Sequence, residues 1–266
     1  MCTAIVLQSL PYFPYLVGFN RDVPYWRGQE SPPHIIEKNY GRLFAPSIRE
    51  NGKELLWIAL NEHDIVGAIT ERKNQDAEEN TESSQSRGTL LAQILPAARS
   101  SENVIRSLEH ALEDQWYAGH FNLLIIGKTF AKRVIYRGRK NPLDVKDVYP
   151  ETCHREYVLP NYRGDEINEE FCETGLRKIT AVHEFMDSYD RVTTHSFTKL
   201  REALRFHSVD DLASRENVCR HRGTGVVETV SSVIIAIPNP KTDTPIFQYV
   251  HGNPCNGQWG NYNVIR

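Results

Sequence analysis

The chain begins with two β-type apolar runs separated by a turn that contains two prolines. Cys2 to Gln8 and Tyr15 to Phe19 are rich in β-branched and aromatic residues, and SLPYFPY lies between them. Such runs, bounded by turn residues, are typical of a β-hairpin. A second pair of runs lies at Glu54 to Leu60 and Asp64 to Thr70, joined by the polar segment NEHD. The pattern therefore predicts two successive hairpins.

Apolar residues then take up helical spacing. From Ser100 to Trp116 they recur three and four positions apart, which predicts an amphipathic helix capped by Ser100 or Ser101. Further helices are predicted at Thr89 to Ala98, Glu169 to Tyr189, Ser196 to Phe206 and Val209 to Ser214. Further strands are predicted at Phe121 to Gly127, Ala131 to Arg137, Arg155 to Asn161, Val227 to Ile237 and Pro245 to Gly252.

Strands therefore come in pairs along the chain, and helices come in separate blocks. This order favours the α+β class, with helices packed on large antiparallel sheets, over alternating βαβ units. The chain has no internal repeat and no linker that divides it, so we expect one domain over residues 1–266. Asn74 to Gly88 contains no large apolar residue, which is typical of an exposed loop.

Composition and charge exclude several classes of function. Hydrophobic residues make up 40% and charged residues 24% of the 266 positions, as in ordinary globular proteins. A net charge of −3 gives no electrostatic support for binding nucleic acid or a membrane surface. Pro11 and Pro14 interrupt the first apolar run and no run has bilayer length, so neither a secretory signal nor a transmembrane segment is expected. Five cysteines without a CxxC pair favour a reduced, cytoplasmic protein.

The first hairpin places a candidate nucleophile beside an acid. If its turn centres near residue 12, the numbers of facing residues sum to about 24, so Cys2 faces Asp22 within a residue or two. Without Met1, Cys2 would carry both a thiol and a free α-amine, and both groups titrate near neutral pH. The amine then takes the thiol proton while a carboxylate orients it. The alternative interpretation is structural, with Cys2 an ordinary second residue and Asp22 a solvated turn residue.

Several motifs together resemble a known family. They are MCT at the start, FNRD at Phe19 to Asp22, LLWIAL before IVGAIT, SRGTLL, YAGHFNLL, VLPN at Val158 to Asn161, VCRHRG with ETVSSVIIAI, and HGNPC at His251 to Cys255. Their order and spacing cover nearly the whole chain. On this basis the chain resembles the NRDE family, also called the transport and Golgi organisation 2 family. That family is similar to N-terminal-nucleophile hydrolases such as bile salt hydrolase and penicillin V acylase.

The resemblance implies a fold and a set of roles. The fold is an αββα sandwich, with two antiparallel sheets face to face and helices outside. By position, Cys2 corresponds to the nucleophile, Asp22 to the acid that holds its amine, and Asn20 to a neighbouring positioning residue. Asn161 corresponds to an amide that binds the oxyanion or the substrate carbonyl. The candidate binding residues are Arg21, Glu71 and Arg177.

Some positions depart from the pattern of the resemblance. Val23 stands where the NRDE signature has Glu, and Phe19 stands where the hydrolases have Arg. Glu71 replaces the Asn that follows Thr70 in them, and an ionised Glu cannot donate a hydrogen bond to an oxyanion. The activating arginine of bile salt hydrolase has no clear counterpart, and the candidates are Arg177, Arg191 and Arg220.

Two functions are compatible with these observations. One is a cysteine amidohydrolase that cleaves a small or lipid-like amide through a thioester on Cys2, with no cofactor. The other is a non-catalytic binding or trafficking factor for an apolar ligand, lipid or haem-like. The resemblance suggests the second because eukaryotic members of the family are associated with Golgi organisation and with lipid or haem handling. Phe19 and Glu71 also favour the second.

A separate group of thiols and imidazoles lies near the end of the chain. Cys219, His221, His251 and Cys255 would form a Cys₂His₂ metal site if the final strands bring them together. The usual spacing of zinc ligands is absent. We therefore expect no metal, and interpret these residues as strand ends that close turns.

Overall fold

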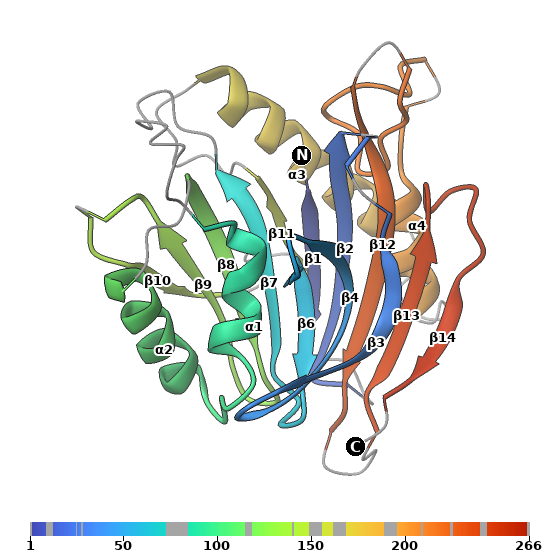
Figure 1. The fold of residues 1–266 in the computed structure, drawn as a ribbon. Coiled ribbons are helices and arrows are strands. Elements are labelled where there is room, and N and C mark those ends of the chain that lie inside the picture. Colours follow the sequence, from blue (N-terminus) through green and yellow to red (C-terminus); the bar gives the residue numbers. More distant parts are fainter. Residues whose placement is uncertain are drawn as a thin grey trace. The chain divides into compact units, whose positions relative to one another are not determined.

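The chain divides into two compact units in a computed structural model (Figure 1). Unit 1 comprises Met1–Arg27 and Pro150–Asn263, and unit 2 comprises Gly28–Tyr149 and Val264–Arg266. The structure describes residues 2–8, 13–24, 26–27, 29–72, 85–114, 119–139, 141–148, 156–161, 169–188, 196–208, 210–223, 226–239 and 244–264. Most of the loop expected over residues 74–88 lies outside the described residues.

Unit 1 is built on a six-stranded antiparallel sheet. Its strands follow in the order β11 (Glu156–Pro160), β1 (Thr3–Gln8), β2 (Tyr15–Pro24), β12 (Val227–Ile237), β13 (Ile246–His251) and β14 (Gly260–Asn263). Two helices, α3 (Glu169–Ser188) and α4 (Ser196–Arg205), cover one face of this sheet (Figure 1). The first hairpin and β12 are therefore neighbours, although they lie near opposite ends of the chain.

The core of unit 1 lies between this sheet and its two helices. Ile5 of β1 belongs to one buried cluster with Val182 of α3 and Leu200 of α4. Because side chains alternate between the faces of a strand, Thr3 lies on the same helix-covered face as Ile5. A Cβ added at Gly18 of β2 would lie 2.9 Å from Leu200 Cδ1. Glycine at this position therefore allows α4 to approach β2 closely.

Unit 2 contains the second antiparallel sheet. Its strands follow in the order β10 (Asp144–Asp147), β9 (Ala131–Tyr136), β8 (His120–Ile126), β7 (Val66–Arg72), β6 (Ile58–Asn61), β4 (Gly41–Glu50) and β3 (Ser31–Lys38), with β5 (Lys53–Leu55) paired to β4. A 3₁₀ segment (Arg87–Thr89), α1 (Leu90–Ile94) and α2 (Ser101–Asp114) precede β8. Apolar residues of α1 and α2 form one buried cluster with residues of this sheet.

The α+β class is confirmed, with two antiparallel sheets and helices packed on each. Both predicted hairpins form, as β1 with β2 and β6 with β7. The five later strands that the pattern predicts form as β8, β9, β11, β12 and β13, each within one residue of its expected bounds. Hydrophobic spacing locates these elements because it directly encodes which face of each is buried.

The sequence pattern does not mark β3, β4, β10 and β14. Pro32 and Pro33 in β3 and Pro46 in β4 interrupt the β-type pattern, because proline lacks the N–H that a ladder needs. β3 lies at the edge of its sheet, where such a loss is tolerated. A prediction from composition alone therefore misses β3, because only a position at the edge of the sheet makes its two prolines compatible with a strand.

The helix predicted over Val209 to Ser214 is wrong, because the described residues 210–214 form turns. The Ser208 hydroxyl accepts from the Asp210 N–H, and the Asp211 carboxylate accepts from the Ala213 N–H. Such local side-chain bonds compete with helix formation. Leu176 of α3 is 51% exposed, although an apolar residue of an amphipathic helix is expected on its buried side. No helix among the described residues is both long and apolar enough to cross a membrane.

Candidate active site

The registers of β1 place three candidate residues in one row at the end of the unit 1 sheet. Thr3 faces Asn20, so facing residue numbers across the hairpin sum to 23, against the expected value of about 24. Continuing the ladders by one residue puts Cys2 between Arg21 of β2 and Asn161, the residue after β11. Facing residues share a face of the sheet. Cys2, Arg21 and Asn161 therefore lie on the face opposite to Thr3.

Ser231 extends this row onto β12, where it faces Arg21. It is fully buried, and its hydroxyl has no hydrogen-bond partner among the described residues. Buried polar groups are nearly always bonded, so such a hydroxyl is an unusual feature. The one sequence signal for Ser231 is a pair of serines inside an otherwise apolar strand.

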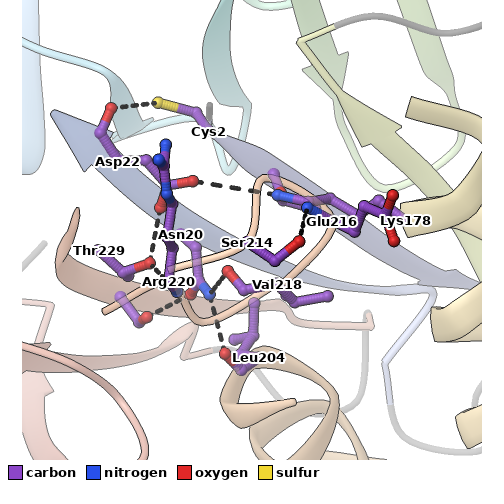
Figure 2. Close-up of polar contacts among 12 residues, drawn as sticks. Cys2, Asn20, Asp22, Lys178, Leu204, Ser214, Glu216, Val218, Arg220 and Thr229 are labelled. Carbon is purple, nitrogen blue, oxygen red and sulfur yellow. Dashed lines mark hydrogen bonds and ion pairs between the residues drawn. The ribbon is translucent and has the colours of Figure 1, made fainter. Parts of the chain in front are cut away.

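The thiol of Cys2 faces the main chain of Asp22 rather than its carboxylate. Cys2 Sγ lies 3.8 Å from the Asp22 carbonyl oxygen, and the residue is partly buried (Figure 2). Burial raises the pKa of the Cys2 thiol and the charge of Asp22 acts in the same direction, whereas Arg21 acts against them. In the chain that carries Met1, the nitrogen of Cys2 belongs to a peptide bond, so this arrangement keeps the thiol neutral.

We expect alkylation of Cys2 in the chain that retains Met1 to be slow at neutral pH. Its rate should still be rising above about pH 8.5, the ordinary thiol pKa, because the thiolate is the nucleophile and its pKa is raised. Iodoacetamide labelling over a pH series, followed by peptide mass spectrometry, measures this rate. N-acetylcysteine is the free-thiol control, and a Cys2 profile that levels off at lower pH than this control would contradict the expectation.

The carboxylate of Asp22 is bound on the helix-covered face. Its Oδ1 accepts a hydrogen bond of 2.7 Å from the Thr229 hydroxyl, and its Oδ2 lies 4.0 Å from Lys178 Nζ. A register shift between Thr229 and Ser231 turns Thr229 to this face, which is a typical effect of a β-bulge. The Thr229 hydroxyl also accepts from the Arg220 N–H, so it links a neighbouring segment to the acid.

Lys178 of α3 is a fully buried cation beside this acid. Its side chain is 1% exposed, and Nζ donates a 3.0 Å hydrogen bond to the Thr3 hydroxyl. Burial lowers the pKa of Lys178, while the charges of Asp22 and Cys2 oppose that shift. Lys178 falls among the apolar residues that form the buried stripe of α3. A lysine inside such a stripe is the signal by which the sequence marks it.

Asn20 links β2, the strand that carries Asp22, to neighbouring segments through side-chain hydrogen bonds. Its Nδ2 donates to the carbonyl oxygens of Leu204 and Val218, both at 2.8 Å, and the Ser232 hydroxyl donates to its Oδ1 (Figure 2). Asn20 is fully buried, so each of these bonds replaces one lost from water. The side chain therefore joins β2 to α4 and to the segment before β12.

The remaining candidates lie elsewhere in the chain. Arg177 is exposed and pairs with Glu173 and Glu216, so its guanidinium is directed toward the surface of unit 1. Glu71 belongs to unit 2, where it accepts a 3.0 Å hydrogen bond from Arg87. Of the two other arginines, Arg191 lies outside the described residues. The Arg220 guanidinium donates to the Ala213 carbonyl; burial lowers the pKa of Arg220, and the charge of Asp22 opposes that shift.

The fold is similar to that of solved hydrolase structures. A mutant of conjugated bile acid hydrolase from Clostridium perfringens matches 100% of this chain and 97% of its own, with a TM-score of 0.53 and 13% identity. A Caenorhabditis elegans ortholog of N-acylethanolamine-hydrolyzing acid amidase matches 91% of this chain and 95% of its own, with a TM-score of 0.57 and 12% identity. At these identities the likeness concerns the fold alone.

The chain matches the Transport and Golgi organisation 2 family over residues 1–252, and it belongs to that family. No curated protein sequence matches the chain.

Proposed function

We propose that the chain is an N-terminal cysteine amidohydrolase that acts on a small or lipid-like amide. The observation that carries this proposal is the position of Cys2, whose sulfur lies 3.8 Å from the Asp22 carbonyl oxygen in a row with Arg21 and Asn161. The fold supports it, since the two solved structures above are by name hydrolases of a conjugated bile acid and of an N-acylethanolamine.

The reaction requires a free amine on Cys2. Removal of Met1 supplies it, and the α-amine then takes the thiol proton. The thiolate attacks the amide carbonyl carbon, the C–N bond breaks, and the leaving amine takes the proton back. Water then hydrolyses the thioester, which releases the acid and restores the Cys2 thiol. No cofactor enters this sequence of steps.

In this proposal Asp22 and Lys178 act together to hold the amine. The carboxylate fixes the α-amine at the strand end, and Thr229 and Lys178 fix the carboxylate. Lys178 is a positioning residue, because it acts through Asp22 and Thr3.

Donors for the developing oxyanion come from the row beside Cys2. Asn161 faces Cys2 across the β1–β11 ladder, and its amide can donate to a carbonyl oxygen as charge develops there. Arg21 faces Cys2 from β2, and its positive charge stabilises the negative charge that develops on the carbonyl oxygen. The roles of Glu71 and Arg177 as binding residues stay predictions from the resemblance.

A second candidate function is the non-catalytic binding of an apolar ligand. The observation that favours it is the raised pKa of the Cys2 thiol, which keeps the sulfur protonated and weakly nucleophilic at neutral pH. This function does not need a free α-amine. The two candidates therefore differ in whether exposure of that amine activates the thiol.

Two forms of the chain, released from a cleavable fusion, separate these candidates. One begins at Cys2, and the other carries a single glycine before Cys2. We expect the first to react with iodoacetamide at neutral pH at least about tenfold faster, because its α-amine serves as a local base. The Cys2 peptide is quantified by mass spectrometry in both forms.

The same two forms are then incubated with an N-acyl p-nitroanilide, and their intact masses are measured. We expect an acyl adduct on Cys2, or release of p-nitroaniline, in the first form alone. A Cys2→Ala variant is the control and should show neither. The mass of the protein from its native host should lack Met1. Equal labelling of the two forms, with no adduct in either, would refute the amidohydrolase and favour the binding protein.

A further inference from the structure

Two cysteines and a histidine meet where the segment before β12 passes the turn after β13. Cys219 Sγ lies 3.5 Å from Cys255 Sγ. His221 Nε2 lies 3.1 Å from Cys255 Sγ and 3.9 Å from Cys219 Sγ. Both thiols are free, with Cys219 buried and Cys255 partly buried. Three donor atoms therefore converge on one point.

These separations match the edges of a tetrahedral metal site. Metal–sulfur bonds of about 2.3 Å and metal–nitrogen bonds of about 2.0 Å set an S···S edge of about 3.8 Å and an S···N edge of about 3.5 Å. All three observed separations fall within about 0.5 Å of these edges. A disulfide, in contrast, would bring the sulfurs to about 2.05 Å.

His207 stands next to this group and supplies a fourth donor. The ligand atoms of His207, His221 and Cys255 all lie within 4.8 Å of one another. The two imidazole rings meet edge to face, with centroids 4.8 Å apart. Nδ1 of His207 lies 3.4 Å from the Ser208 carbonyl oxygen, a contact that orients an imidazole and leaves Nε2 for a metal. Cys219 is not part of this group of three, so the partly buried His207 side chain must turn toward Cys219 Sγ to complete a tetrahedral set.

The three segments that carry these donors are already joined by hydrogen bonds. The Cys219 N–H donates to the Phe206 carbonyl at 2.9 Å, which ties this segment to the end of α4. The Asn253 side chain donates to the Arg220 carbonyl at 3.1 Å, and the Gly257 N–H closes the turn by donating to the Asn253 carbonyl. The donors are therefore held in place by bonds that do not depend on a metal, as a preorganised site requires.

We propose that Cys219, Cys255, His221 and His207 bind a divalent metal ion that prefers tetrahedral coordination, Zn²⁺ being the best fit to two thiolates and two imidazoles. Four protein ligands leave no open position, so the ion is structural rather than catalytic. It joins the end of α4, the segment before β12 and the turn after β13. His251, which the sequence groups with these residues, is exposed and contacts Tyr249 instead.

Metal binding is tested on the full chain without a histidine tag, reduced with a phosphine under nitrogen. Competition with a chromophoric chelator should show about one Zn²⁺ per chain. With Co²⁺ in its place, we expect a thiolate-to-cobalt charge-transfer band and the intense visible bands of a tetrahedral site. The same preparation of a Cys2→Ser variant should give the same stoichiometry, because Cys2 is not a ligand.

Variants identify the ligands. Cys255→Ser and His207→Asn should each weaken Zn²⁺ binding by at least about tenfold, whereas the matched change His251→Asn should not alter it. Where a variant fails to fold, the cobalt spectrum of the unaltered chain decides the question. Substoichiometric Zn²⁺, a cobalt spectrum without a thiolate band, a Cys219–Cys255 disulfide formed at the expense of binding, or greater loss from His251→Asn than from His207→Asn would each overturn the proposal.

Discussion

Replacement of Asp22 by asparagine is expected to lower the free energy of unfolding by about 3 kcal/mol, because it leaves the buried Lys178 without its charge partner. Both side chains are at most 1% exposed, so water cannot take over the lost interaction. Asparagine keeps the shape of the side chain and can still accept from Thr229. The loss therefore reports charge rather than packing. Urea denaturation near neutral pH measures it.

A double-mutant cycle isolates the pair. Lys178→Met removes the buried cation and leaves most of the side-chain volume, and it should also destabilise the chain. Asp22→Asn combined with Lys178→Met should cost clearly less than the two single changes together, because the double variant buries no charge. Arg177→Met, one residue along the same helix, is the exposed control and should leave the denaturation midpoint unchanged. Strict additivity of the two single changes would show that Lys178 and Asp22 are not coupled.

Replacement of Asn20 by alanine is expected to cost about 3–5 kcal/mol, because it leaves several buried polar groups without partners. The carbonyls of Leu204 and Val218 lose their donor, and the Ser232 hydroxyl loses its acceptor. A cavity adds to the loss. Thermal and urea unfolding measure it, and the change should be visible as a lower midpoint by both methods.

Asn263→Ala is the matched control for this change, since Asn263 is an exposed asparagine at the end of the edge strand β14. We expect its effect to stay within about 0.5 kcal/mol. If the two alanine variants were equally stable, Asn20 would not be the residue that joins β2 to α4 and to the segment before β12.

Local spacing of residues anticipated most of the regular structure. The strand Val227–Ile237 forms with the predicted bounds, because its run of β-branched residues ends in a continuous apolar stretch, Val233 to Ile237, that a proline follows. The hairpin register came within one residue of the expected value, because turn length and alternation together restrict strand pairing. The pattern did not predict β3, because its two prolines are tolerated in a strand only at the edge of a sheet.

The candidate site likewise contains residues that local patterns bring together and residues that they do not. Cys2, Asn20 and Asp22 lie on the first hairpin, so pattern and register suffice to place them near one another. Lys178 reaches Asp22 from a helix far along the chain, and no spacing rule links the two. Their roles in catalysis are predictions that the experiments above address.

The sequence by itself determined the α+β class, the hairpins and the thiol at the start of the first strand, because these follow from short-range periodicity. The tertiary structure alone decided that Lys178 is buried against Asp22, that a bulge turns Thr229 toward that acid, and that His207 rather than His251 stands beside His221 and Cys255. These three features depend on contacts between segments distant in sequence. Such contacts are set by strand registers and helix packing, which no local window of residues encodes.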